Sequence, residues 1–203
     1  MPHMKSNLVT AAIMTTALWS VAAYGQDPSP ADFVTQATLA GTTEVLAART
    51  ALKNSQSADV HAFAQQMIKD HSRANMRLAS IAKSKGLPVP VHLDAIHRAA
   101  LDSLRAQTGA AFDAAYAEQM VADHAEAVAL FKSEAAAQGD ADLSAFAQKT
   151  LPTLEHHKSM ADALAAQHGA ASPSGNTARA ASECNACRGD EAAADFLAAV
   201  GYG

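Results

Sequence analysis

The chain has 203 residues, of which 49% are hydrophobic but only 5% are aromatic, and it carries a formal net charge of −5. An acidic chain lacks the basic face that nucleic-acid binding requires, and the apolar content is too high for a disordered chain. Because much of that content is alanine, the strongest helix former, the composition predicts an all-α fold.

The N-terminal segment, from Met1 to Gly25, has the pattern of a secretory signal peptide. Lys5 precedes an apolar run from Leu8 to Ala23, and Ala23 and Gly25 are the small residues of a cleavage site. The run is shorter than the roughly 20 apolar residues that span a bilayer. We therefore expect cleavage near Gly25 rather than an uncleaved anchor. The mature chain is expected in the periplasm or outside the cell, with no membrane span.

Four long helical segments follow, at about 31–54, 58–85, 110–138 and 141–168. Each far exceeds the usual three to four helical turns. The connector over residues 87–108 differs in character, and we expect one short helix within it, at about 93–106. Long helices with short links pack as antiparallel hairpins, and one long crossover between two hairpins is the topology of ferritin-like folds.

Residues 31–168 are therefore predicted to form a ferritin-like four-helix bundle, followed by a flexible C-terminal tail over 169–203. The tail holds the only two cysteines, Cys184 and Cys187, in a C-x-x-C pair. Arg188 follows, so the pair lacks the histidine of a haem-attachment motif. A local disulfide is the simplest interpretation in an oxidising compartment.

The two halves of the predicted bundle repeat each other. Residues 58–65, Ala-Asp-Val-His-Ala-Phe-Ala-Gln, resemble residues 141–148, Ala-Asp-Leu-Ser-Ala-Phe-Ala-Gln, so that Ala58 corresponds to Ala141. The same register places Gly86, a predicted helix stop, on Gly169. A register kept over two helices and a stop indicates a duplicated helical hairpin.

Each long segment carries one strong metal-ligand residue on its apolar stripe. These residues are Glu44, His71, His124 and His157. His156 lies about 100° further round the helix and is expected in solvent. Within each hairpin the two residues lie at similar distances from the turn. With the turns at opposite ends of the bundle, all four side chains are expected to converge near its middle.

A carboxylate and three imidazoles are costly to bury unless they bond one another or a cation. The set suits a single Zn, Fe, Cu or Mn ion, which predicts a metal site with all four residues as ligands. The alternative is a cofactor-free structural or stress-related envelope protein, in which the same residues form a hydrogen-bond network.

The pattern Met-x-x-Asp-His occurs twice, at 67–71 and 120–124. Together with Asp32-Phe33, Gly109 to Phe112-Asp113, and Leu151-Pro152 before His157, it resembles a bacterial secreted ferritin-like family, domain of unknown function 4142, over about residues 31–168. The resemblance implies a ferritin-like four-helix bundle and no established reaction. Asp70 and Asp123 of the two copies are candidates for outer ligands or for orienting neighbouring groups.

Ferritins build a di-iron site from glutamates and Glu-x-x-His pairs. Here Ile68 and Leu154 stand three residues before His71 and His157, and His124 takes the place of a glutamate. We therefore do not expect ferroxidase-type activity, and the sequence contains no catalytic motif. It leaves protein partners and the oligomeric state open.

Overall fold

A computed structural model describes residues 29–169, which are all-α with no strand among them. The helices are α1 (Pro30–Asn54), α2 (Ala58–Ser84), α3 (Ala95–Arg105), α4 (Gly109–Ala136) and α5 (Ala141–His168). All five expected helices are confirmed, with each end within two residues of its predicted position. The predicted signal peptide, the tail beyond Gly169 and the Cys184–Cys187 pair lie outside the described residues.

Side-chain caps set the first residue of two of the long helices. Ser29 begins α1 in a capping box, in which its Oγ accepts from the N–H of Asp32 while the Asp32 carboxylate accepts from the N–H of Ser29. Asp140 begins α5, as predicted, and accepts from the N–H groups of Asp142 and Leu143 at 3.0 and 3.1 Å. These bonds satisfy donors that a helix N-terminus otherwise leaves open.

The two glycine stops that the repeat places in register differ in backbone conformation. Gly86 has φ +66°. It ends α2 in a Schellman motif. The N–H of Gly86 donates to the carbonyl of Lys83, and the N–H of Leu87 donates to the carbonyl of Ala82. Gly169 follows α5 with φ −69°, in the right-handed helical region rather than the left-handed one. The register of the sequence repeat therefore keeps the position of the stop but not its backbone conformation.

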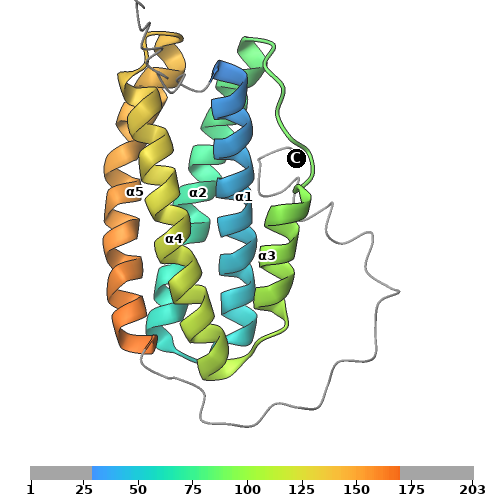
Figure 1. Ribbon diagram of the computed structural model, residues 1–203, viewed down its shortest axis with the longest axis vertical. Coiled ribbons are helices and arrows are strands. Elements are labelled where there is room, and N and C mark those ends of the chain that lie inside the picture. Colours follow the sequence, from blue (N-terminus) through green and yellow to red (C-terminus); the bar gives the residue numbers. More distant parts are fainter. Residues whose placement is uncertain (1–28, 170–203) are drawn as a thin grey trace, which may run out of the picture.

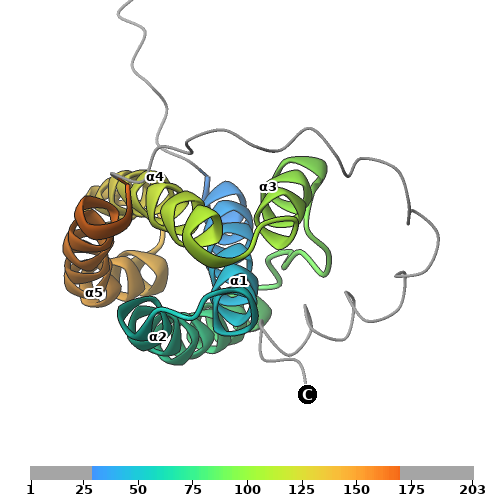
Figure 2. The same ribbon diagram turned by 90° about the horizontal axis from the view of Figure 1, so that it is seen from below.

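The four long helices lie side by side around a shared core, and α3 packs outside it against α1 (Figure 1 and Figure 2). The α1–α2 turn lies at the bottom of Figure 1 and the α4–α5 turn at the top. The connector that contains α3 runs back along the bundle between them. Helices pack most closely within each hairpin, and α2 approaches α5 less closely.

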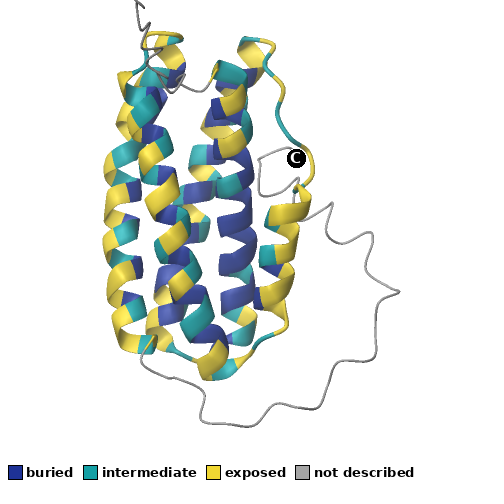
Figure 3. Ribbon diagram, viewed as in Figure 1, coloured by how far each residue is buried: buried dark blue, intermediate teal, exposed yellow. Residues whose placement is uncertain are grey.

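The apolar core consists of two clusters, one toward each end of the bundle. Buried faces turn inward along all four long helices (Figure 3). The lower cluster, nearer the α1–α2 turn, has as its largest members Phe63, Met67, Phe112, Tyr116 and Met120. Leu101 and Leu104 of α3 join it. The upper cluster includes Phe33, Leu78, Phe131, Leu143 and Phe146.

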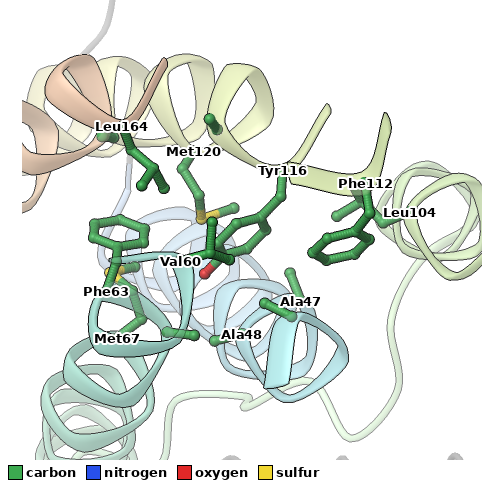
Figure 4. Packing of buried hydrophobic residues seen from close by; sticks show 14 of the residues in the cluster. Ala47, Ala48, Val60, Phe63, Met67, Leu104, Phe112, Tyr116, Met120 and Leu164 are labelled. Carbon is green, nitrogen blue, oxygen red and sulfur yellow. The ribbon is translucent and has the colours of Figure 1, made fainter. Parts of the chain in front are cut away.

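The hydroxyl of Tyr116 is buried within the lower cluster and has no hydrogen-bond partner among the described residues (Figure 4). Because an unpaired buried hydroxyl is unfavourable, Tyr116→Phe should leave the free energy of unfolding unchanged or raise it by about 1 kcal/mol. Tyr116→Leu is the matched control. It removes ring contacts with Phe63 and Phe112 and should lower that free energy by about 1 kcal/mol or more. Urea denaturation of the three proteins tests this, and clear destabilisation by Tyr116→Phe would contradict it.

Candidate metal centre

The four side chains predicted from helical periodicity meet in one buried layer. Glu44 on α1, His71 on α2, His124 on α4 and His157 on α5 are each at most 5% exposed. Along each of the four long helices the layer falls between the residues of the lower cluster and those of the upper cluster. His156, the neighbour of His157, is exposed as expected. The centre is therefore a polar layer enclosed by apolar packing above and below.

The three histidines face one another across the bundle. Their ring centroids are 5.2 Å apart for His71 and His157, 5.5 Å for His71 and His124, and 5.6 Å for His124 and His157. One ring nitrogen from each lies within 4.8 Å of those of the other two. These side chains come from three different helices, so the bundle itself assembles the group.

One nitrogen of each imidazole is held by an oxygen outside the group. His71 Nδ1 lies 2.8 Å from Glu44 Oε2, and His157 Nε2 lies 3.1 Å from Asp70 Oδ2. His124 Nδ1 lies 2.9 Å from the carbonyl oxygen of Met120. Because these oxygens accept hydrogen bonds, the three nitrogens donate to them. In a neutral ring the other nitrogen then carries a lone pair, which is the arrangement that metal-binding histidines adopt.

The remaining nitrogens meet at a point that favours a cation. His71 Nε2 and His157 Nδ1 are 3.2 Å apart, so two lone pairs would face each other unless a proton or a metal ion lies between them. His124 Nε2 is buried and has no hydrogen-bond partner within residues 29–169. Nitrogens that bind one tetrahedral ion at about 2.1 Å are separated by about 3.4 Å. The His71–His157 pair already lies near that spacing, and one nitrogen of His124 lies within 4.8 Å of both rings' ligand atoms.

Glu44 lies in the layer but outside the group of three nitrogens. Its Oε2 accepts from His71 Nδ1, and its Oε1 is 3.6 Å from His124 Nδ1 with no hydrogen-bond partner in the described part of the chain. The carboxylate thus faces the outer nitrogens of two histidines. This geometry suits an orienting role more directly than the ligand role predicted from sequence.

The charges in the layer are set by burial and by mutual attraction. Burial raises the pKa of Glu44 and lowers that of His71, but their attraction outweighs burial, so the net pKa shift is downward for Glu44 and upward for His71. Burial lowers the pKa of His124, and burial together with the charge of His71 lowers that of His157 to about 4. At neutral pH, His124 and His157 are therefore uncharged, as metal ligands must be.

The two Met-x-x-Asp-His copies place their aspartates differently. Asp70 accepts from His157 Nε2 at 3.1 Å and from Gln66 Nε2 at 2.5 Å. Asp123 accepts from Gln119 at 3.2 Å, and no bond joins it to the three histidines. Burial and the nearby charge of Glu44 raise the pKa of Asp123 to about 6. Of the two aspartates that the sequence offered as outer groups, only Asp70 holds a histidine of the layer.

The internal repeat does not duplicate the centre. In the register that aligns the two hairpins, His124 corresponds to Gly41 and Glu44 corresponds to Ala127. These two small residues line a cavity of about 20 Å³ beside Glu44 and His71. That volume suits about one water molecule. The described bundle therefore holds one histidine centre. A small cavity lies beside it, lined by the two residues that take the places of His124 and Glu44 in the repeat.

Sequence reasoning did not identify the carbonyl of Met120 as the partner of His124. A carbonyl is present at every residue, so residue type gives no signal. The spacing does give one, because His124 lies four residues after Met120 and hence directly above it on the same helix.

Comparison with known proteins agrees with the resemblance noted in the sequence. The sequence model of the family described as Domain of unknown function (DUF4142) matches residues 17–164. The chain belongs to this family. No curated protein and no solved structure matches the chain. None of the described helices is both long and apolar enough to cross a membrane. Membership in the family assigns no function, so any function must be argued from the histidine layer.

The low pKa of His157 predicts how stability depends on pH in the metal-free protein. Between the ordinary histidine pKa of 6.5 and the native value of about 4, the unfolded chain binds a proton that the native chain does not. The free energy of unfolding should therefore fall as the pH falls through this window, by about 3 kcal/mol from this residue.

Chemical denaturation between pH 7 and pH 4 tests this expectation. His157→Gln should reduce the pH dependence, whereas His156→Gln, the exposed neighbour, should keep it. An identical pH dependence in wild type and His157→Gln would contradict the assignment.

Proposed function

We propose that this chain is an exported, ferritin-like helical-bundle protein that binds one transition-metal ion in its core. In this proposal His71, His124 and His157 are the ligands, and Glu44 and Asp70 hold two of them from outside. The observation that carries it is the orientation of the three imidazoles. One nitrogen of each imidazole donates to an oxygen outside the group, and the three rings offer nitrogens within 4.8 Å of one another. His124 Nε2 is buried and has no hydrogen-bond partner among the described residues.

The ligand set favours Zn, Fe, Cu or Mn, because neutral imidazoles suit these ions at a single centre. Three protein ligands leave a coordination position open, as in metal sites that bind small molecules. When bound, the ion would act as a Lewis acid toward a molecule at that position.

The cofactor-free alternative has one observation in its favour. If His71 is protonated, Glu44, His71, His157 and Asp70 form a continuous chain of hydrogen bonds without any ion. That chain leaves His124 Nε2 without a partner in the described bundle. A buried unpaired polar group costs about 1–3 kcal/mol, and a bound ion would satisfy this nitrogen. The metal-binding function therefore accounts for more of the layer.

Separate observations support the fold and export parts of the proposal. Two hairpins with turns at opposite ends, joined by a connector that runs the length of the bundle, have the connectivity of ferritin-like folds. Export rests on the signal-peptide pattern from Met1 to Gly25, a segment that lies outside the described part of the chain.

Removing His124 should abolish metal binding. Purified mature protein loaded with Zn, Fe, Cu or Mn and then desalted is expected to retain about one ion per chain. His124→Gln should lose the ion, and His156→Gln should keep it, because His156 is exposed. Elemental analysis gives the metal content, and circular dichroism confirms that the variants fold. Equally low metal content in wild type and His124→Gln under all four loadings would rule out the site.

The two aspartates give a second, sharper comparison. Asp70→Asn weakens the group that holds His157 and should lower metal affinity about 10- to 100-fold. Asp123→Asn alters the matching residue of the other motif copy and should leave the affinity unchanged, because Asp123 bonds Gln119 instead. Competition with a chromophoric chelator measures both affinities. Equal losses in the two variants would contradict the role given to Asp70.

A further inference from the structure

A surface groove of about 580 Å³ lies between α2 and α5. These two helices are neighbours in the ring of four seen in Figure 2, and they pack less closely than the helices of either hairpin. The volume falls within the range of small-molecule binding sites. The groove is therefore large enough to hold an organic molecule rather than only water.

Three cationic side chains line the groove without a partner among the described residues. Arg73 and Arg77 are four residues apart on α2, a spacing that places both on the same face of the helix. Lys149 lines it from α5. All three are exposed, and none forms an ion pair or a hydrogen bond with another described residue. Their charges are thus available to a ligand.

The two carboxylates that line the groove are already engaged. Asp142 forms an ion pair with Lys85, in which Lys85 Nζ lies 2.7 Å from Asp142 Oδ2. Asp70 accepts from Gln66 and His157, as described above. Although the whole chain has a net charge of −5, the groove presents three positive charges that no described residue pairs with.

The rest of the lining is apolar or weakly polar. Ile81 and Phe146 contribute buried side chains, and Thr150 and Thr153 contribute hydroxyl-bearing side chains. Arginine presents a planar fork of donors that matches carboxylate and phosphate oxygens. A ligand that fits both parts of this lining has an anionic group and an apolar body.

We propose that the groove between α2 and α5 is a binding site for a small organic oxyanion, a carboxylate or phosphate ester with an apolar body. Arg73, Arg77 and Lys149 bind the anionic group, and the side chains of Ile81 and Phe146 contact the body. The cationic residues belong to no part of the histidine layer. The inference therefore stands independently of the proposed metal function.

Calorimetric titration of the full-length, metal-free chain with phenyl phosphate and with benzoate tests the proposal. Saturable binding of at least one of them is expected, weakened by added NaCl because salt screens exposed charges. Phenol, which has the ring without the charge, should not bind. Inorganic phosphate, which has the charge without the ring, should bind more weakly.

Matched variants locate the site. Arg73→Gln combined with Arg77→Gln should lower the affinity about tenfold or more, since hydrogen bonds to charged groups are among the strong ones. Lys83→Gln removes one charge from α2 outside the groove and should leave the affinity unchanged. The proposal is overturned if neither oxyanion binds, if phenol binds as well as the oxyanion, or if inorganic phosphate matches phenyl phosphate. Equal affinities in the double variant and Lys83→Gln would overturn it as well.

Discussion

The 2.8 Å contact between Glu44 Oε2 and His71 Nδ1 is the interaction on which the centre of the bundle depends. A carboxylate that is 1% exposed needs compensation, because a buried unpaired charge destabilises a protein by several kcal/mol. His71 supplies that compensation, and its other nitrogen then faces His157. The chain of contacts continues to Asp70, at the groove. One buried charge thus fixes the orientation of a row of side chains across the bundle.

The same layer constrains how the two hairpins fit together. The apolar clusters on either side consist largely of alanine, leucine and phenylalanine side chains, which tolerate several packings. A slip of one hairpin past the other by one helical turn moves a side chain by about 5.4 Å, which would break the hydrogen bonds that join the two hairpins. The bond between His71 and His157 and the bond that His157 donates to Asp70 join α2 to α5 and would not survive such a slip. The polar layer therefore favours one register of the two hairpins.

Helical periodicity was sufficient to predict the helices and the four inward residues, because a period of 3.6 decides which side chains face the core. It could not decide what those side chains bond. Asp70 and Asp123 occupy the same place in the same motif, yet Asp70 meets His157 of a neighbouring helix while Asp123 meets Gln119 of its own. The difference arises from packing between helices, which a local pattern does not encode. The groove was missed for the same reason, since Arg73 and Lys149 lie on separate helices.

Asp70 connects the two proposed sites. It lines the groove between α2 and α5, and it holds His157 in the histidine layer. A negative ligand in the groove would stabilise positive charge at the centre, and a metal ion at the centre would in turn favour the anion. Such coupling is reciprocal by thermodynamic necessity. If the centre binds a metal ion and the groove binds an anion, each ligand should therefore raise the affinity of the protein for the other. Replacing Asp70 should alter this coupling, because Asp70 lines the groove and also holds His157.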